Sequence, residues 1–165
     1  MISLKILEIK NFMSHLLVHN VFDNYFMSEL DITTFTNFHI SGKLNHEYYS
    51  SDEAEMLNGR RFSLWSEMKP FAFSLLKGNK LPSSIKIVFA LAPENIEKLL
   101  TKYSVPFKSE EVSGLFLNIR YENGNLYLIS GTSVQTFTLD KSLEHAWDSY
   151  VKAFLKHYEI AYEEQ

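Results

Sequence analysis

The sequence contains no cysteine, and it has few of the residues that interrupt regular structure. The absence of cysteine excludes disulfide bonds, a thiolate nucleophile and cysteine-ligated zinc. With 6 glycines and 4 prolines among 165 residues, the chain is neither collagen-like nor of low complexity. The remaining composition, 45% hydrophobic and 15% aromatic, predicts a folded chain that forms a single domain over residues 1–165.

An excess of positive charge and a long apolar run are also missing. The formal net charge is −4, so the chain lacks the basic character that would make nucleic acid or an anionic membrane an automatic partner. No segment approaches the roughly 20 apolar residues of a membrane span. Residues 1–11 alternate Ile and Leu with Lys and Glu, unlike the apolar core of a signal peptide. These patterns predict a soluble, cytoplasmic protein that does not act at a membrane.

Motifs that identify a reaction are missing too. The sequence has no nucleophile elbow, Walker loop, dinucleotide-binding glycine turn or paired-acid signature. Because catalytic groups meet in space rather than in sequence, a small-molecule enzyme stays open as a third hypothesis. The sequence favours a non-enzymatic protein, and it predicts no cofactor.

Self-similarity between the two halves is the most informative pattern that is present. Trp65 and Trp147 lie 82 residues apart, and each belongs to a segment with the apolar spacing of an amphipathic helix. Gly42 and Gly124 are also 82 residues apart, and each is followed two residues later by leucine. Asn123 precedes the second glycine, and Asn-Gly is a strong hairpin signal because both residues tolerate the positive φ of a type I′ turn.

Two strand patterns repeat at an offset of 81 residues. Residues 35–40 (Phe-Thr-Asn-Phe-His-Ile) match residues 116–121 (Phe-Leu-Asn-Ile-Arg-Tyr) through a shared Phe-x-Asn-x-(His/Arg). Residues 3–7 match residues 84–88, and both segments alternate in the manner of a half-buried strand. The offsets drift between 81 and 83, so chance similarity among common residues is the alternative to an internal duplication.

These patterns predict an α+β fold of two tandem strand-helix-strands-helix repeats, at residues 2–77 and 84–160. The repeats would form a pseudo-two-fold antiparallel sheet with helices on one face. Helices are expected from Lys10 to about Phe22 and at 65–77, 93–103 and 143–155, with hairpin turns at 41–44 and 123–126 and a last strand at 132–139. Gly78, Asn79 and Pro82 mark the junction between the halves, and residues 50–61 are expected to form a solvated, mobile loop.

Two resemblances add to this interpretation. Residues 22–44, with Thr33-Thr34-Phe35-Thr36, together with Trp65-Ser66-Glu67 and residues 76–82, resemble a family of uncharacterised bacterial proteins classed as a domain of unknown function. That likeness covers most of the chain and implies no activity. In topology, the tandem units resemble the saddle of the TATA-box-binding protein and, less closely, the sliding clamps, which lack the long helix after each hairpin. This second likeness implies a pseudo-symmetric sheet with an open face.

Side-chain alternation selects the residues that would occupy such a face. In residues 115–121, the residues at odd positions are apolar or aromatic and are expected to face the helices, so the residues at even positions point away from them. The candidate binding face contains Phe35, Asn37, His39, Phe116, Asn118, Arg120 and Tyr127. Aromatic, amide and cationic side chains can stack on a planar ligand, or they can be buried by a partner protein. The alternative is that the phenylalanines form a second core layer or the seam of a homodimer.

The first hypothesis is therefore a non-enzymatic binding or protein-interaction module whose partner is a protein, a small ligand or a second copy of the chain. Nucleic-acid binding by a saddle-like sheet is the alternative function. The net charge disfavours it, because phosphate contacts need clustered Lys and Arg, and here the cations are scattered among acids.

A metal site has weaker support. His15, His19 and Asp23 are spaced four residues apart, so a helix could present two imidazoles and a carboxylate to one ion. The same residues fit a polar flank beside the apolar stripe of Phe12 and Leu16, and no His-Glu-x-x-His pattern accompanies them.

Overall fold

Strands from both ends of the chain pair in one antiparallel sheet. The computed structural model describes residues 1–78 and 80–165. The strands are β1 (Ser3–Ile6), β2 (Phe26–Thr33), β3 (Asn37–Ser41), β4 (Ser63–Leu64), β5 (Ser84–Ala90), β6 (Val112–Glu122), β7 (Asn125–Val134) and β8 (Tyr162–Glu164). Their order in the sheet is β3-β2-β5-β6-β7-β1-β8, and the short β4 also pairs with β2.

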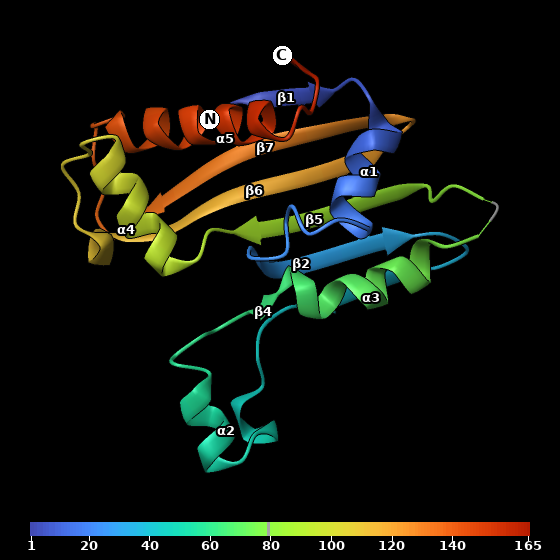
Figure 1. Ribbon diagram of the computed structural model, residues 1–165, viewed down its shortest axis with the longest axis horizontal. Coiled ribbons are helices and arrows are strands. Elements are labelled where there is room, and N and C mark those ends of the chain that lie inside the picture. Colours follow the sequence, from blue (N-terminus) through green and yellow to red (C-terminus); the bar gives the residue numbers. More distant parts are fainter. Residues whose placement is uncertain (79) are drawn as a thin grey trace.

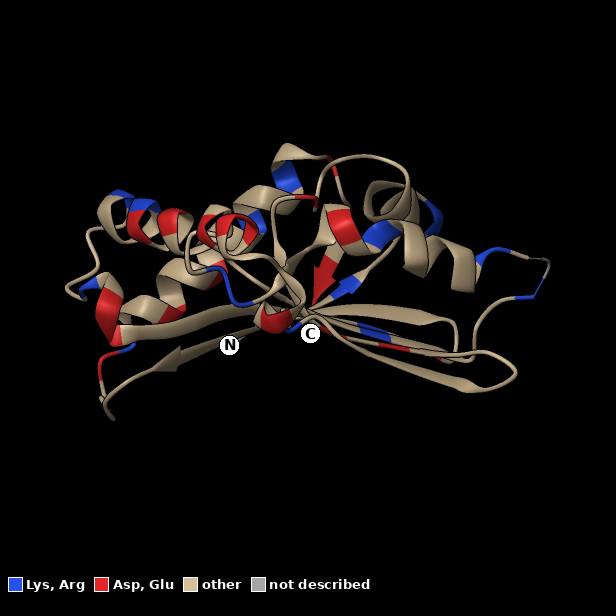
Figure 2. Ribbon diagram, turned by 90° about the horizontal axis from the view of Figure 1, so that it is seen from below, with Lys and Arg blue, Asp and Glu red and all other residues tan. Residues whose placement is uncertain are grey.

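Helices cover one face of this sheet. The described residues form α1 (Ile9–Leu17), α2 (Ser51–Met56), α3 (Trp65–Leu76), α4 (Pro93–Lys102) and α5 (Ser142–His157). All of them except α2 lie on the same side of the strands, as Figures 1 and 2 show. The expected α+β class, with an antiparallel sheet and helices on one face, is confirmed, and none of the helices in residues 1–78 and 80–165 lies over the other face of the sheet.

The core fills the layer between the sheet and the helices. The central strands bury most of their alternate residues there, including Leu30, Ile87, Leu117 and Leu128, and bulges in β2 and β6 interrupt the alternation. Trp65 of α3 and Trp147 of α5 are fully buried as well. Each indole N–H donates a hydrogen bond to a backbone carbonyl: that of Trp65 to Leu16 O at 2.7 Å, and that of Trp147 to Phe116 O at 2.8 Å. The two tryptophans therefore fix α3 to the end of α1, and α5 to the middle of the sheet.

Of the two predicted hairpins, one is confirmed and one is displaced. Asn123 and Gly124 join β6 to β7 with φ of 52° and 74°, as a type I′ turn requires. The first hairpin is not at 41–44: residues 34–36 join β2 to β3, and the backbone N–H of Thr34 donates to Thr36 O. Gly42 instead begins the chain segment that leaves the sheet.

Two element boundaries differ from the prediction, and one strand was not predicted. The first helix ends at Leu17 rather than near Phe22, and residues 20–24 form turns. The strand expected at 132–139 ends at Val134, because Val134 pairs with Val112, the first residue of β6, and the neighbouring strand offers no further residues. The C-terminal strand β8, which pairs with β1, was not predicted, because three residues are too few for an alternation pattern.

The internal duplication is not confirmed. Both halves follow the order strand, helix, strand, strand, and each has a later helix. The strand pairing does not repeat. In the second half, β5 lies next to β6, the strand that follows it in the chain. In the first half, the corresponding β1 lies between β7 and β8, and not next to β2. Of the three residues expected at the junction, Asn79 lies outside the described residues.

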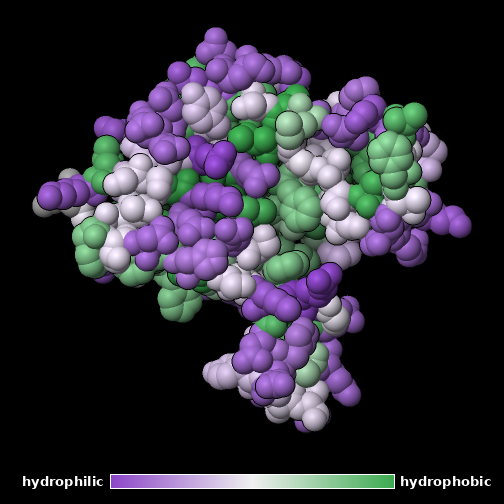
Figure 3. Space-filling model, turned by 180° about the vertical axis from the view of Figure 1, so that it is seen from behind, coloured by the Kyte–Doolittle hydropathy of each residue, from purple (hydrophilic) through white to green (hydrophobic). Residues whose placement is uncertain are grey.

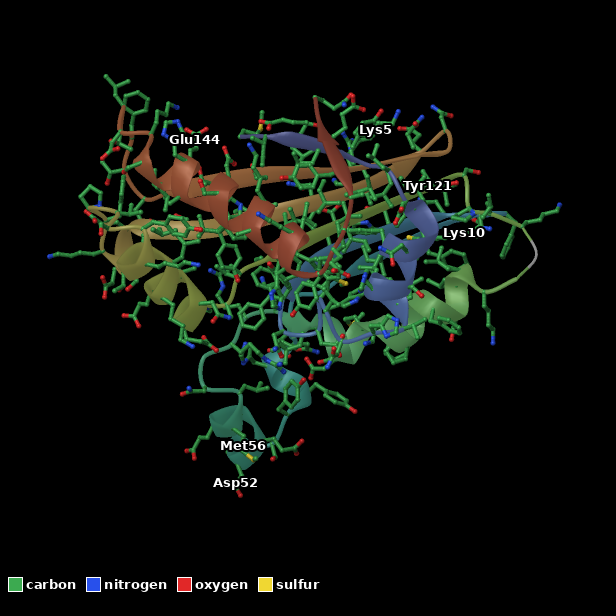
Figure 4. The ribbon with its side chains drawn as sticks, turned by 45° about the horizontal axis from the view of Figure 1, so that its top comes forward. Lys5, Lys10, Asp52, Met56, Tyr121 and Glu144 are labelled. Carbon is green, nitrogen blue, oxygen red and sulfur yellow. The ribbon has the colours of Figure 1, made fainter. Side chains whose placement is uncertain are left out.

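Residues 43–62 form an arm that extends away from the sheet. Its two ends meet through a bridge between Lys43 and Phe62 and a 2.9 Å hydrogen bond from Leu44 N to Arg61 O. The segment expected to be a loop contains the short helix α2, whose N-terminus is capped by the hydroxyl of Ser50. Figure 4 shows Asp52 and Met56 at the far end of the arm.

Candidate functional site

The open face of the sheet carries a row of polar side chains that crosses six strands. In the pairing register, the residues that lie opposite one another in successive strands are His39, Asp31, Lys86, Arg120, Tyr127 and Lys5, from β3 to β1. Acidic, cationic and hydroxyl groups therefore share one line across the sheet. We call these six residues the polar row.

An apolar patch lies beside the polar row, toward the end of β6 that is near β4. Its residues are Phe26, Val88, Ala90, Phe116 and Ile129, from four neighbouring strands. Four of them are partly exposed, and Ala90 is buried. Figure 3 shows this side of the molecule, where hydrophobic residues (green) and neutral residues (white) lie next to an area of hydrophilic residues (purple). The face thus presents an apolar area with charge on its border.

Phe116 is the aromatic centre of the apolar patch. A Cβ placed on Gly114 would lie only 2.5 Å from Cζ of the Phe116 ring, so the ring lies directly over this glycine. Gly131 is the cross-strand partner of Phe116 and likewise leaves its side of the ring open. The absence of a side chain at Gly114 therefore makes room for the ring, which stays partly exposed on this face.

Six of the seven predicted face residues lie on the open face. The parity argument holds for Asn37, His39, Phe116, Asn118, Arg120 and Tyr127, whose neighbours along the strands point toward the helices. Phe35 is the exception: it lies in the turn between β2 and β3, is 92% exposed, and packs edge to face with the Phe38 ring at 5.9 Å between centroids. The prediction for Phe35 was wrong because β3 starts at Asn37, so strand alternation does not reach residue 35.

The two sets of predicted residues are not adjacent. Strands β2 and β5 separate β3 from β6, so the sets are three strand spacings apart, about 14 Å. The residues between them are Glu29, Asp31, Lys86 and Val88. Sequence reasoning missed these, although the flanking Ile85 and Ile87 predict by simple alternation that Lys86 faces away from the core.

Most polar groups of the open face already have partners. His39 Nδ1 lies 3.0 Å from an Asp31 carboxylate oxygen, and the Lys86 ammonium lies 3.5 Å from Glu29. The Asn118 amide donates to Ile129 O at 3.3 Å. The exposed Arg120 forms no ion pair within residues 1–78 and 80–165. Lys5 likewise forms no ion pair within the described residues. The face therefore offers a partner an apolar contact area and two unpaired cations, rather than a set of unsatisfied hydrogen-bonding groups.

The sequence also matches a known family over nearly its whole length. The model of the family of unknown function DUF5721 aligns with residues 15–163. The chain belongs to this family. No curated protein and no solved structure matches it, so the family supplies no activity to transfer, and the expected likeness of this DUF5721 member to the saddle or to sliding clamps is not confirmed.

Two of the three candidate metal ligands of this DUF5721 chain lie close together, since the His15 and His19 rings are 5.7 Å apart, but Asp23 does not join them. Because α1 ends at Leu17, His15, His19 and Asp23 do not share one helix. Asp23 instead forms a 2.6 Å ion pair with Lys69, and its carboxylate is thereby neutralised. The described residues contain one other group of suitable geometry, Glu29, Asp31 and His39 on the open face, where the Lys86 ammonium already contacts Glu29.

The helices of the DUF5721 fold are short. Within residues 1–78 and 80–165, none has both the length and the apolar character that a bilayer span requires.

Proposed function

We propose that this protein is a non-enzymatic interaction module that uses the open face of its sheet to bind another protein surface. The observation that carries the proposal is the apolar patch bordered by the polar row on a sheet face without helices. Protein interfaces combine an apolar centre with a polar rim, and aromatic and arginine side chains contribute most to their affinity. Phe116 and Arg120 have these two roles in the proposal.

A second copy of the chain is the partner that we infer. The polar row contains both signs of charge. Asp31 lies near the β3 edge of the sheet, Arg120 lies on the central strand, and Lys5 lies near the other edge, where Glu163 of β8 is its cross-strand neighbour. A two-fold axis through the face would place the cations of one copy opposite the acids of the other, and the apolar patches could then pack together. Two-fold dimers are the commonest oligomers and need such a self-complementary surface.

Nucleic-acid binding stays the alternative function, and the charges on the face disfavour it. The lysines and arginine of this face are Lys5, Lys86 and Arg120. By the strand register the same face carries the acids Glu29, Asp31, Glu122 and Glu163, so it has no excess of cations that would neutralise phosphates. An enzyme would need a pocket with convergent ionisable groups, which a sheet face with internally paired side chains does not provide. A cytoplasmic location stays a prediction, which microscopy of a fluorescent fusion would check.

Replacing Phe116 by serine tests the proposed face. We expect Phe116→Ser to weaken self-association at least about tenfold, because truncation of an aromatic anchor costs more than loss of a rim contact. Sedimentation velocity over a wide range of protein concentration measures the effect. The free energy of unfolding should fall by less than about 2 kcal/mol, because the ring is partly exposed in the folded chain.

Phe35→Ser is the matched control, since it removes the same ring from the exposed turn outside the patch. It should leave self-association unchanged. A wild-type chain that stays monomeric at every concentration would exclude the second copy as partner. Binding of a labelled single-stranded oligonucleotide that is lost in Lys86→Glu would support the nucleic-acid alternative instead.

A further inference from the structure

A cavity of about 470 Å³ lies on the helix-covered side of the sheet, away from the open face. Its walls come from α4, from α5 and from the segment that precedes β2. The residues that the argument uses are Tyr25, Asn95, Lys102, Tyr150, His157 and Tyr158. The volume lies within the usual range for small-molecule sites, about 300–1,000 Å³.

A buried hydroxyl without a partner lines this cavity. Tyr25 is 6% exposed, and its phenolic oxygen forms no hydrogen bond within the described part of the chain. The Tyr25 ring is held between Phe89, stacked at 5.7 Å, and Phe154, edge-on at 5.7 Å, so the hydroxyl has a fixed direction. Buried polar groups in native proteins are almost always hydrogen-bonded, so this hydroxyl indicates a missing acceptor.

The Tyr25 hydroxyl remains a donor over the whole physiological range of pH. Burial raises the pKa of Tyr25 well above its ordinary value, and the nearby Tyr150 raises it further. The Tyr150 hydroxyl is close enough to affect the pKa of Tyr25, but the two hydroxyls do not meet the geometry of a hydrogen bond in the described structure.

The charges around the cavity favour an anion. Lys102 and His157 line it, and no acidic side chain is among its described lining residues. Both side chains are exposed, and Lys102, which carries a positive charge, forms no ion pair within residues 1–78 and 80–165. The remaining walls are aromatic: Tyr158 packs against both Phe154 and His157, with ring centroids 5.0 and 4.7 Å apart.

We propose that this cavity binds a small aromatic anion, such as an aryl carboxylate or sulfonate. The ring of the ligand would stack among Tyr150, Phe154 and Tyr158, and its charged group would face Lys102. An oxygen of the ligand accepts the hydrogen bond that Tyr25 has free, and the Asn95 amide supplies a further donor. This site is separate from the open face and does not depend on the function proposed above.

The probe that tests the site is 1-anilinonaphthalene-8-sulfonate, which combines fused aromatic rings with one sulfonate. We expect the folded chain to bind it with a rise in fluorescence, and Lys102→Met to weaken binding about tenfold, as loss of a charge-assisted contact does. Lys98→Met is the matched control, because it changes an exposed lysine on the same helix that does not line the cavity. Phe116→Ser on the open face should also leave binding unchanged.

Tyr25→Phe separates a ligand site from a structural role. Removing a buried hydroxyl that has no partner should raise the urea midpoint of unfolding, while probe binding weakens several-fold. A hydroxyl needed for the fold would instead lower the midpoint. The proposal is overturned by a chain that does not bind the probe, by equal binding in Lys102→Met and Lys98→Met, or by loss of binding in Phe116→Ser alone.

Discussion

Trp147→Ala should lower the free energy of unfolding by about 3–5 kcal/mol, the usual range when a fully buried tryptophan is truncated. The side chain is 0% exposed and stacks on Tyr150 with ring centroids 5.4 Å apart. The substitution removes these contacts and leaves a cavity between α5 and the sheet. It also leaves the carbonyl of Phe116 without the indole donor that it accepts from at 2.8 Å. Urea unfolding followed by far-UV circular dichroism measures the loss.

Trp147→Phe separates the two contributions to this loss. Phenylalanine keeps much of the apolar volume but cannot donate to Phe116 O, so we expect a cost of about 1–3 kcal/mol, that of an unpaired buried acceptor with partial loss of packing. Phe35→Ala serves as the surface control, because this ring is almost entirely exposed. A loss below about 1 kcal/mol for Trp147→Ala, typical of surface substitutions, would place the indole outside the core.

Gly42→Ala should destabilise the fold by at least about 3 kcal/mol, more than ordinary overpacking costs, because the obstacle is backbone. A Cβ at this position would overlap with the carbonyl oxygen of Met27 and lie 2.7 Å from its carbonyl carbon. Gly42 N donates to Ser28 O at 3.0 Å, and Gly42 O accepts from Ser63 N at 2.7 Å. The glycine thus connects β2 with β4 at the point where the arm leaves the sheet. Neither strand can withdraw without losing these bonds.

Gly59→Ala provides the comparison for Gly42→Ala. Gly59 lies in the arm with φ of 75°, and nothing stands within 4 Å of the added methyl group. Its cost comes only from the unfavourable φ and should be about 1 kcal/mol. Chemical denaturation of both variants tests the difference, and equal losses would mean that the close approach at Gly42 relaxes without penalty.

Local signals in the sequence predicted the local parts of this fold. The Asn123-Gly124 turn and the helix at 93–102 depend on residues that are neighbours in the chain, and both are present within a residue or two of the expected bounds. The position of β1 depends on residues far away: it pairs with Tyr127 to Ile129 in β7. Alternating apolar residues say which side of a strand is buried, but they do not say which strand lies beside it.

The same distinction applies to the two sites. Strand parity was enough to place Phe116 and Arg120 on the open face. It failed at Phe35, because Thr34-Phe35-Thr36 contains no glycine or asparagine to reveal a turn. The cavity was not predictable, because Tyr25, Lys102 and His157 come from three segments that meet only in the folded chain. The sequence identifies Tyr150 as part of the apolar face of a helix. It does not tell whether a residue of that face lines the cavity or packs in the core.

The place of β1 between β7 and β8 affects the order in which the chain can fold. Ser3 pairs with Ile129, so this contact closes a loop of 126 residues, whereas two residues close the β6–β7 hairpin. Closing the longer loop in an unfolded chain costs about 4 kcal/mol of free energy through lost chain entropy. This cost falls only after the intervening elements have become compact. During synthesis, β1 is made well before β7 and β8, the two strands with which it pairs. Until β7 arrives, the buried residues Leu4 and Ile6 have no strand to pair with and remain open to chaperones or to other nascent chains.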